Sequence, residues 1–493
     1  MATHDGAAGG TLALATRQGR LVLLATVLAS GVAFLDGTVV VVALPRIGED
    51  LGADFSALQW VLDAYLLTLG SLVLAGGALG DVLGRRRVFL VGMWGFGFAS
   101  LLCAVAWSPA ALVGARAVQG VFAALLTPAS LAILSASFAS EERGRAIGAW
   151  SGLAGVTTAI GPFLGGWLVD AASWRWVFLI NVPILAATVL LTRAVVPADP
   201  GAAHGLSRRQ MIHRIDLPGA ALTVIGLALI VTPLIEAGRL HPAVVMGSVT
   251  AGVLTLVAFV VYEHRRDQPM LPPGLFRIRT FTVANLVTLT AYAALTVNSF
   301  LLSVALQLGL GYSALAAGAA TVPMTLVLLA FSARVGALLP RTGARPLLTL
   351  GGLLAGAGLA LLAGINPDTT YLTGVLPGVL VFAAGLVLIV APVTTTALTD
   401  VPADRQGVAS GTNNAVARVG GLLAVAVLPL AAGLSTAEDL DTAALLDGVS
   451  VALWIAALLC VAAAVTAWVG LRTKDCQGVP ARTPVPGQGG VAA

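Results

Sequence analysis

Three charged residues stand inside stretches of the sequence that are otherwise apolar: Asp36, Asp63 and Arg116. Because an ionised carboxylate in hydrocarbon is costly, such an acid usually faces a cavity, pairs with a cation or holds a proton. A neighbouring guanidinium favours the charged carboxylate and a dry cavity favours the protonated form, so a pair that forms and opens could exchange a proton. A static ion pair satisfies the same burial penalty, and the charges alone allow both interpretations.

The depth of these residues indicates which of them meet. A rise of about 1.5 Å per residue places Asp36 about 12 Å, Asp63 about 9 Å and Arg116 about 8 Å below the outer ends of their segments. At this shared height we expect Asp36 and Arg116 to form a pair, which could serve either as a proton-coupling pair or as a static ion pair.

Asp63 has aromatic neighbours in the sequence, Trp60 and Tyr65. A carboxylate and aromatic faces together attract a lipophilic cation, so these three residues are candidate substrate contacts. Trp60 suits an anchor at the membrane interface equally well, because tryptophan is enriched at that height.

A second polar group interrupts a later apolar segment, where Asn413 and Asn414 precede Arg418. The two asparagines are candidate substrate contacts, although hydrogen bonds between helices would explain them as well.

Small residues repeat in two places. One face of the segment that ends near residue 169 is nearly smooth and includes Gly155, Gly161, Pro162, Gly165 and Gly166. Small residues allow helices to approach closely, and Pro162 removes a backbone donor and bends the helix. We expect a moving or sealing interface there, with ordinary close packing as the simpler reading.

The second place is the loop from Gly77 to Arg87, which sets Asp81 beside a basic cluster at the membrane surface. Ion pairing there could fasten two helix bundles and break when they rock apart. The candidate gating residues of this loop are Gly77, Asp81, Gly84, Arg85 and Arg86.

The composition indicates the elements that hold these residues. Of 493 residues, 58% are hydrophobic and 10% are charged, and the mean hydropathy is +0.95. A span needs about 20 apolar residues, and the sequence predicts fourteen such helices. Most of the 27 Lys and Arg residues fall on the side that the termini share, which predicts that both termini are cytoplasmic.

Polar interruptions divide this all-α, polytopic membrane protein into blocks. We expect a six-helix bundle in 1–193, linkers with two additional central helices in 194–280, a second six-helix bundle in 281–470 and a disordered cytoplasmic tail in 471–493.

Several functions are disfavoured. Cys103 and Cys460 lie in apolar segments and Cys476 lies near the C-terminus, a pattern without metal-ligand spacing, so we expect no metal and no cofactor. Arginines next to spans explain the basic charge without a nucleic-acid partner. We find no nucleophile–base set or nucleotide-binding loop, and therefore expect no enzyme.

Together these residues resemble the major facilitator superfamily, and within it the fourteen-span drug:proton antiporters that export antibiotics and quaternary ammonium compounds. Five ordered motifs carry the resemblance, at 35–45, 77–87, 116–120, 155–166 and 174–183. One departure is Val41, where the first motif commonly has Asn, which predicts a missing polar contact near Asp36.

The resemblance implies two bundles plus a central pair and a plasma-membrane exporter of drug-like or antibiotic small molecules, coupled to protons through Asp36 and Arg116. It further implies alternating access, lipophilic or cationic substrates and a monomer. A dedicated exporter of one endogenous metabolite or antibiotic is the alternative. A non-transporting membrane sensor is a weaker one, because no soluble signalling domain is predicted.

Overall fold

The computed structural model describes residues 12–197, 215–266, 269–402, 405–434 and 441–472, and these fold into helices almost throughout. Within them, fourteen helices are long and apolar enough to cross a membrane, which confirms the predicted all-α membrane fold. The predicted disordered tail falls, apart from residues 471 and 472, outside the described residues.

The first six spans run back and forth from residue 17 to residue 195. They are α1 (Arg17–Leu51), α2 (Phe55–Leu83), α3 (Arg85–Ala104), α4 (Pro109–Ser137), α5 (Ser140–Ala171), and the short α6 (Trp176–Leu179) followed by α7 (Asn181–Val195). The two central helices are α9 (Leu217–Ile235) and α10 (Pro242–His264).

The last six spans contain three interruptions. They are α11 (Arg279–Val304) with the π-helical turn η2 (Ala305–Gly309), α12 (Ala314–Ala320) with α13 (Val322–Thr342), α14 (Ala344–Leu362), η3 (Tyr371–Val375) with α15 (Leu376–Leu398), α16 (Gln406–Ala431) and α17 (Thr442–Gly470). A short 3-10 turn, η1 (Pro273–Arg277), precedes α11. Proline explains two of the breaks, because Pro323 and Pro377 begin helices where a missing backbone donor does no harm.

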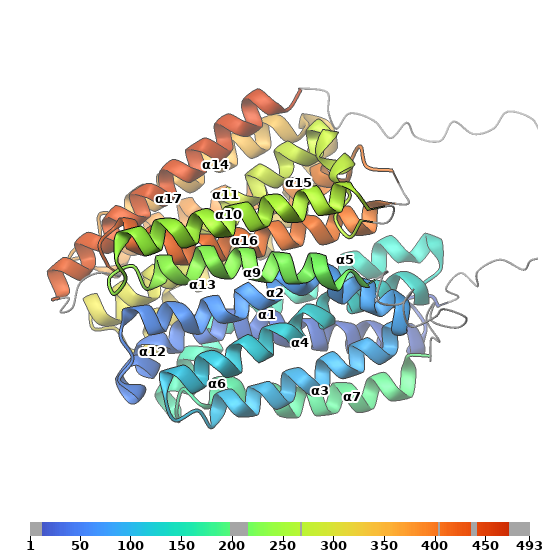
Figure 1. Ribbon diagram of the computed structural model, residues 1–493, viewed down its shortest axis with the longest axis horizontal. Helices are drawn as coiled ribbons and strands as arrows, with labels where there is room; N and C mark the ends of the chain where they lie inside the picture. Colours follow the sequence, from blue (N-terminus) through green and yellow to red (C-terminus); the bar gives the residue numbers. More distant parts are fainter. Residues whose placement is uncertain (1–11, 198–214, 267–268, 403–404, 435–440, 473–493) are drawn as a thin grey trace, which may run out of the picture.

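The two ends of the helical body differ in charge. Arg17, Arg86, Arg193, Arg279 and Arg472 share one end, which we call the basic end, and Arg46, Arg175 and Arg239 lie at the opposite end. In Figure 1, α9 and α10 run in green between the blue-to-teal N-terminal helices and the orange-to-red C-terminal helices. Contacts join α9 to both α2 and α16, so the central pair covers one side of the junction between the two halves.

Among the described residues, the apolar cluster that joins α1 of the N-terminal half to α11 of the C-terminal half lies toward the opposite end. One cluster joins Val41 and Leu44 of α1 to Val304 and Leu306 of the α11–η2 segment. A separate cluster toward the basic end, which includes Phe89, contains residues of the N-terminal helices alone. The two halves are therefore packed together at the opposite end and part toward the basic end.

Candidate functional site

The buried ion pair predicted between α1 and α4 is present. Arg116 Nη1 donates to Asp36 Oδ2 over 2.5 Å, and both side chains are fully buried. Arg116 also donates from Nε to the carbonyl oxygen of Val61 at 3.0 Å. In this dry setting the attraction between the charges is strong, but it offsets their desolvation only because hydrogen bonds satisfy the remaining polar atoms.

Three further polar side chains complete this site, and sequence reasoning did not assign them. Gln119 Nε2 and Asn181 Nδ2 each donate to Asp36 Oδ1 at 2.9 Å. Both amides also donate to Ser100 Oγ of α3, at 2.9 Å and 3.3 Å. Four helices of the N-terminal half thus converge on one carboxylate. The prediction that Asp36 lacks a polar contact, drawn from Val41, is wrong, because α4 and α7 supply the donors.

Tyr65 lies against this pair, on the side of the guanidinium. Its ring centroid is 4.3 Å from Arg116 Cζ, and its hydroxyl donates to the carbonyl oxygen of Ala33 at 3.2 Å. The phenyl ring of Phe178 lies 5.8 Å from the same guanidinium carbon. Tyr65, a candidate substrate contact from the sequence, is therefore placed beside the ion pair by cation–π contact.

Asp63 does not join the pair. It lies four residues after Gln59, whose Nε2 donates to the carbonyl oxygen of Val425 on α16, and seven before Gly70, which packs against Arg418. This spacing sets Asp63 on the face of α2 that meets α16. Its side chain is fully buried, and neither carboxyl oxygen has a hydrogen-bond partner among the described residues.

Trp60 faces the central helix pair. Its Nε1 donates to Glu236 Oε1 at 2.9 Å at the end of α9, and its ring packs in the apolar cluster that contains Val231 and Ile235. The structure thus separates the three residues grouped by sequence: Trp60 packs on α9, Asp63 lies against α16 and Tyr65 covers Arg116.

The polar residues of α16 that the sequence placed together, Asn413, Asn414 and Arg418, also point in different directions. Asn413 is buried and donates from Nδ2 to Thr288 Oγ1 at 2.8 Å and to Asn285 Oδ1 at 3.2 Å, so it bonds α16 to α11. Asn414, the next residue, is only partly buried. Arg418, one turn further along the face of Asn414, reaches α1, where its guanidinium carbon is 5.6 Å from the ring of Phe34.

The glycines of α5 change their surroundings along the helix. A Cβ atom added at Gly161 would lie 1.9 Å from Thr38 Oγ1, at Gly165 2.9 Å from Val39 Cγ1, and at Gly166 2.4 Å from the carbonyl oxygen of Ala314. The approach is mutual, because a Cβ at Gly318 of α12 would lie 2.1 Å from the carbonyl oxygen of Pro162. These small residues bring α5 against α1 and α12 toward the opposite end.

Hydrogen bonds reinforce this closure between the halves. Ser303 Oγ and Gln307 Nε2 donate to the carbonyl oxygens of Val41 and Val42 at 3.2 Å and 3.0 Å. Asp170 at the end of α5 accepts from the backbone N–H of Leu315 at 2.8 Å, in the first turn of α12.

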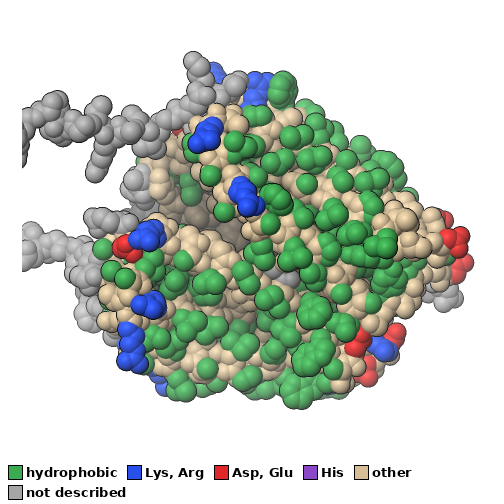
Figure 2. All heavy atoms as spheres, turned by 180° about the vertical axis from the view of Figure 1, so that it is seen from behind, with side chains coloured by type: hydrophobic (Ala, Val, Ile, Leu, Met, Phe, Trp, Pro, Cys, Tyr) green, Lys and Arg blue, Asp and Glu red, His purple; other side chains and the backbone are tan. Residues whose placement is uncertain are grey.

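The basic end is open. A Cβ atom added at Gly148, Gly152 or Gly155 would have no neighbour within 4 Å. Figure 2 shows the surface hollowed between two lobes, on the side where most of the visible arginines gather. Gly155 therefore lines open space, whereas Gly161, Gly165 and Gly166 lie in close contact.

The charged loop after α2 makes contacts within its own half. Asp81 pairs with Arg85 at 3.3 Å, and Arg86 Nη2 donates to the carbonyl oxygen of Arg193 at 2.8 Å. Gly84 between α2 and α3 has a φ of +96°, a backbone conformation that glycine adopts without steric cost. A Cβ atom added at Gly77 would lie 3.6 Å from Cβ of Pro128, in ordinary van der Waals contact. The contacts of Asp81 and Arg86 thus join residues of the N-terminal half, and fastening of the two halves by this loop stays a prediction.

Comparison with known proteins decides the family. The model of the Major Facilitator Superfamily matches residues 26–425. The chain belongs to this superfamily.

Two curated relatives of this superfamily cover most of the chain. The puromycin resistance protein pur8 of Streptomyces alboniger is 39% identical over 450 residues, 88% of each chain. The cephamycin export protein CmcT of Amycolatopsis lactamdurans is 38% identical over 434 residues, 87% of each chain. Relatives of this superfamily protein thus include antibiotic resistance and export proteins.

Solved transporters share the fold. The crystal structure of the peptide transporter POT in complex with sulfate superposes with a TM-score of 0.68 at 15% identity, over 96% of this chain and 98% of that one. As a superfamily member the chain is a multi-pass membrane transporter of small molecules, rather than an enzyme. No cluster of His, Cys, Asp or Glu suited to a metal occurs among the described residues.

Proposed function

We propose that this superfamily member is a proton-coupled antiporter that exports antibiotic-like small molecules across the plasma membrane by alternating access. The observation that carries the proposal is the fully buried Asp36–Arg116 pair, held by amides from two helices. A pair that serves packing alone would be matched as well by apolar residues, since buried ion pairs contribute little net stability. Retention of a charge at this depth is typical of a group that exchanges protons.

The conformation supports one half of the transport cycle. With both termini in the cytoplasm, the open basic end faces the cytosol, and the close contacts of α5 with α12 at Gly166 and Gly318 shut the outer side. Substrate enters the hollow from the cytosol. Closure of the basic end would then bring the loop with Asp81, Arg85 and Arg86 against the C-terminal half.

Proton exchange follows from the environment of Asp36. In this conformation Arg116, Gln119 and Asn181 each donate one hydrogen bond to its carboxylate. Opening of the outer side separates α1, the helix of Asp36, and α5 from the C-terminal half, and admits external protons. Protonation weakens the attraction to Arg116, which keeps its bonds to the Val61 carbonyl and Gln119.

Asp63 takes a different part in the proposal. An ionised carboxylate without donors is too costly in the closed α2–α16 contact, so the group there carries a proton. When the α2–α16 contact loosens, Asp63 ionises and attracts the cationic part of a substrate that has entered from the cytosol. We propose that Trp60 holds the end of α9 and that Tyr65 holds Arg116, and that neither residue contacts the substrate.

The hollow offers lipophilic and polar contacts to a substrate. Phe34 packs on Trp150 with ring centroids 6.3 Å apart, and the guanidinium of Arg418 lies beside Phe34. We propose that these residues and Asn414 contact a lipophilic substrate that offers an oxygen acceptor to Arg418. The protein acts as a monomer, because one chain contains both halves of the hollow.

The test is accumulation of puromycin and of a fluorescent lipophilic cation in inverted membrane vesicles. Native protein is expected to accumulate at least one of them, and a protonophore or the Asp36→Asn substitution is expected to abolish accumulation. Accumulation by Asp36→Asn at the native rate would contradict the proposal.

The names of the relatives favour a second candidate, a dedicated exporter of one antibiotic. Deletion of the gene would then cause one native compound to accumulate in the cell, with unchanged export of dyes.

A further inference from the structure

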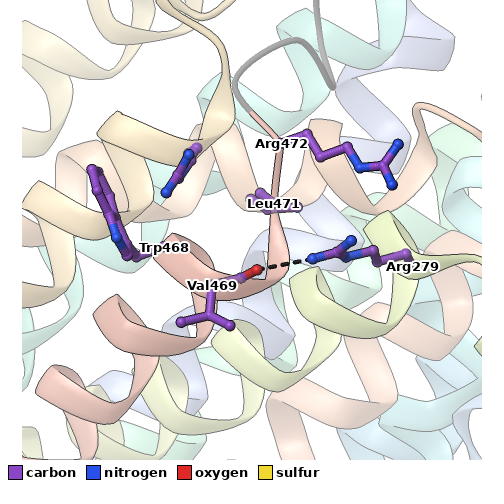
Figure 3. A pocket seen from close by; sticks show the side chains of 6 residues that line it. Arg279, Trp468, Val469, Leu471 and Arg472 are labelled. Carbon is purple, nitrogen blue, oxygen red and sulfur yellow. Dashed lines mark hydrogen bonds between the residues drawn. The ribbon is translucent and has the colours of Figure 1, made fainter.

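A second site lies at the basic end of the C-terminal half, where α11 and α14 begin and α17 ends. A pocket of 480 Å³ is lined there by Arg279, Arg345, Arg472, Trp468, Val469 and Leu471. Three of the six lining residues are arginines, and the other three are apolar (Figure 3). We propose that this pocket binds the phosphate headgroup of an anionic phospholipid.

Two of the guanidinium groups are held in place before any ligand arrives. Arg279 donates from Nε to the carbonyl oxygen of Gly470 at 2.6 Å and from Nη2 to that of Val469 at 2.9 Å. These bonds satisfy the last carbonyls of α17. Arg345 stacks on Trp468, with its guanidinium carbon 3.9 Å from the ring centroid. Fixed guanidinium groups suit phosphate oxygens, because little side-chain freedom is lost on binding.

The surface beside the pocket fits a lipid better than a soluble anion. Five apolar side chains of α17 are exposed at spacings of four, three, four and three residues: Trp454, Leu458, Val461, Val465 and Trp468. This spacing sets them on one face, as a ridge about 21 Å long that ends at the pocket. The ridge exceeds the hydrocarbon depth of one leaflet, about 15 Å. A diacyl phospholipid would lay its chains along the ridge with its phosphate among the arginines.

The test uses the purified full chain in detergent and native mass spectrometry with equal amounts of phosphatidylglycerol and phosphatidylcholine. The native protein is expected to retain phosphatidylglycerol in preference. The double variant Arg345→Gln, Arg472→Gln is expected to bind it about 25-fold more weakly, a factor of about five for each charge. Arg279 is left intact because it caps α17.

Two control variants and a competition experiment with inorganic phosphate separate the possible results. Arg341→Gln removes an exposed arginine of the same end that does not line the pocket, and is expected to bind like the native protein. The variant Arg345→Lys, Arg472→Lys keeps the charge and is expected to retain most of the preference. Unchanged phosphatidylglycerol binding by the Gln variant, or displacement of the lipid by millimolar inorganic phosphate, would overturn the proposal.

Discussion

The closed contact between α5 and α12 predicts a strong effect of one methyl group. In Gly166→Ala the added Cβ would lie 2.4 Å from the carbonyl oxygen of Ala314, about 1 Å short of ordinary van der Waals contact. Backbone surrounds the position on the α12 side, so the two helices must move apart. Overpacking of this kind costs about 1–3 kcal/mol, which shifts the equilibrium toward an open outer side by a factor of about 5 to 150.

The shift can be measured with a cysteine at Ser303, which is buried in the same closure. In purified protein that carries Ser303→Cys, the rate of maleimide labelling reports how often the outer side opens. Gly166→Ala is expected to raise this rate at least fivefold over a background measured without the introduced cysteine. Gly155→Ala adds the same methyl group in open space and is expected to leave the rate unchanged. Equal rates in the two folded variants would refute the reasoning.

Three other substitutions separate the roles proposed for the charged residues. Asp36→Asn is expected to abolish export driven by a proton gradient in vesicles while substrate exchange across the membrane continues. Asp63→Asn mimics the protonated acid of the closed contact. It is expected to keep the export rate of neutral substrates within about threefold of native and to lower the export rate of cations more than tenfold. An efflux series with matched charged and neutral dyes measures both rates. Arg418→Gln is expected to raise the half-saturating concentration of substrates with acceptor oxygens about tenfold, from loss of one charged hydrogen bond, with unchanged proton coupling.

The fold could be predicted because lipid imposes a simple rule on the sequence. A backbone in hydrocarbon must satisfy its own hydrogen bonds, so each apolar segment of about 20 residues is a helix. That rule predicted fourteen spans, and the described part of the chain contains fourteen. The breaks at Thr321 and Ile180 were not predicted, because they divide spans whose apolar character is continuous.

The ion pair could be predicted for a related reason. Charges are so rare in the spans that Asp36 and Arg116 at one height had few alternative partners. Gln119 and Asn181 carry no charge and are less conspicuous, although Gln119 follows Arg116 by three residues and so shares its face. That spacing was the available signal. Asn181 stands in the motif at 174–183 but has no helical spacing to Asp36 or Arg116, since only the packing of α7 against α1 and α3 brings it to Asp36.

The aromatic residues around Asp63 could not be assigned from the sequence, because neighbours in a helix point in different directions. Trp60 and Tyr65 are five residues apart and face α9 and α4 respectively. Proximity in sequence suggested one binding site. A helix distributes such residues around its axis, and only i, i+3 and i, i+4 pairs share a face.

The placement of the ion pair implies a route for coupling. Asp36 binds partners of the N-terminal half alone, whereas the closure that transport must open joins α1 and α5 to the C-terminal half. α1 belongs to both, because Asp36 lies within six residues of Thr38, Val39 and Val42, which contact α5 and Gln307. That interval is about 9 Å of a single helix. A change at the carboxylate that shifts or rotates α1 therefore acts directly on the closure, and no chain of intervening side chains is required.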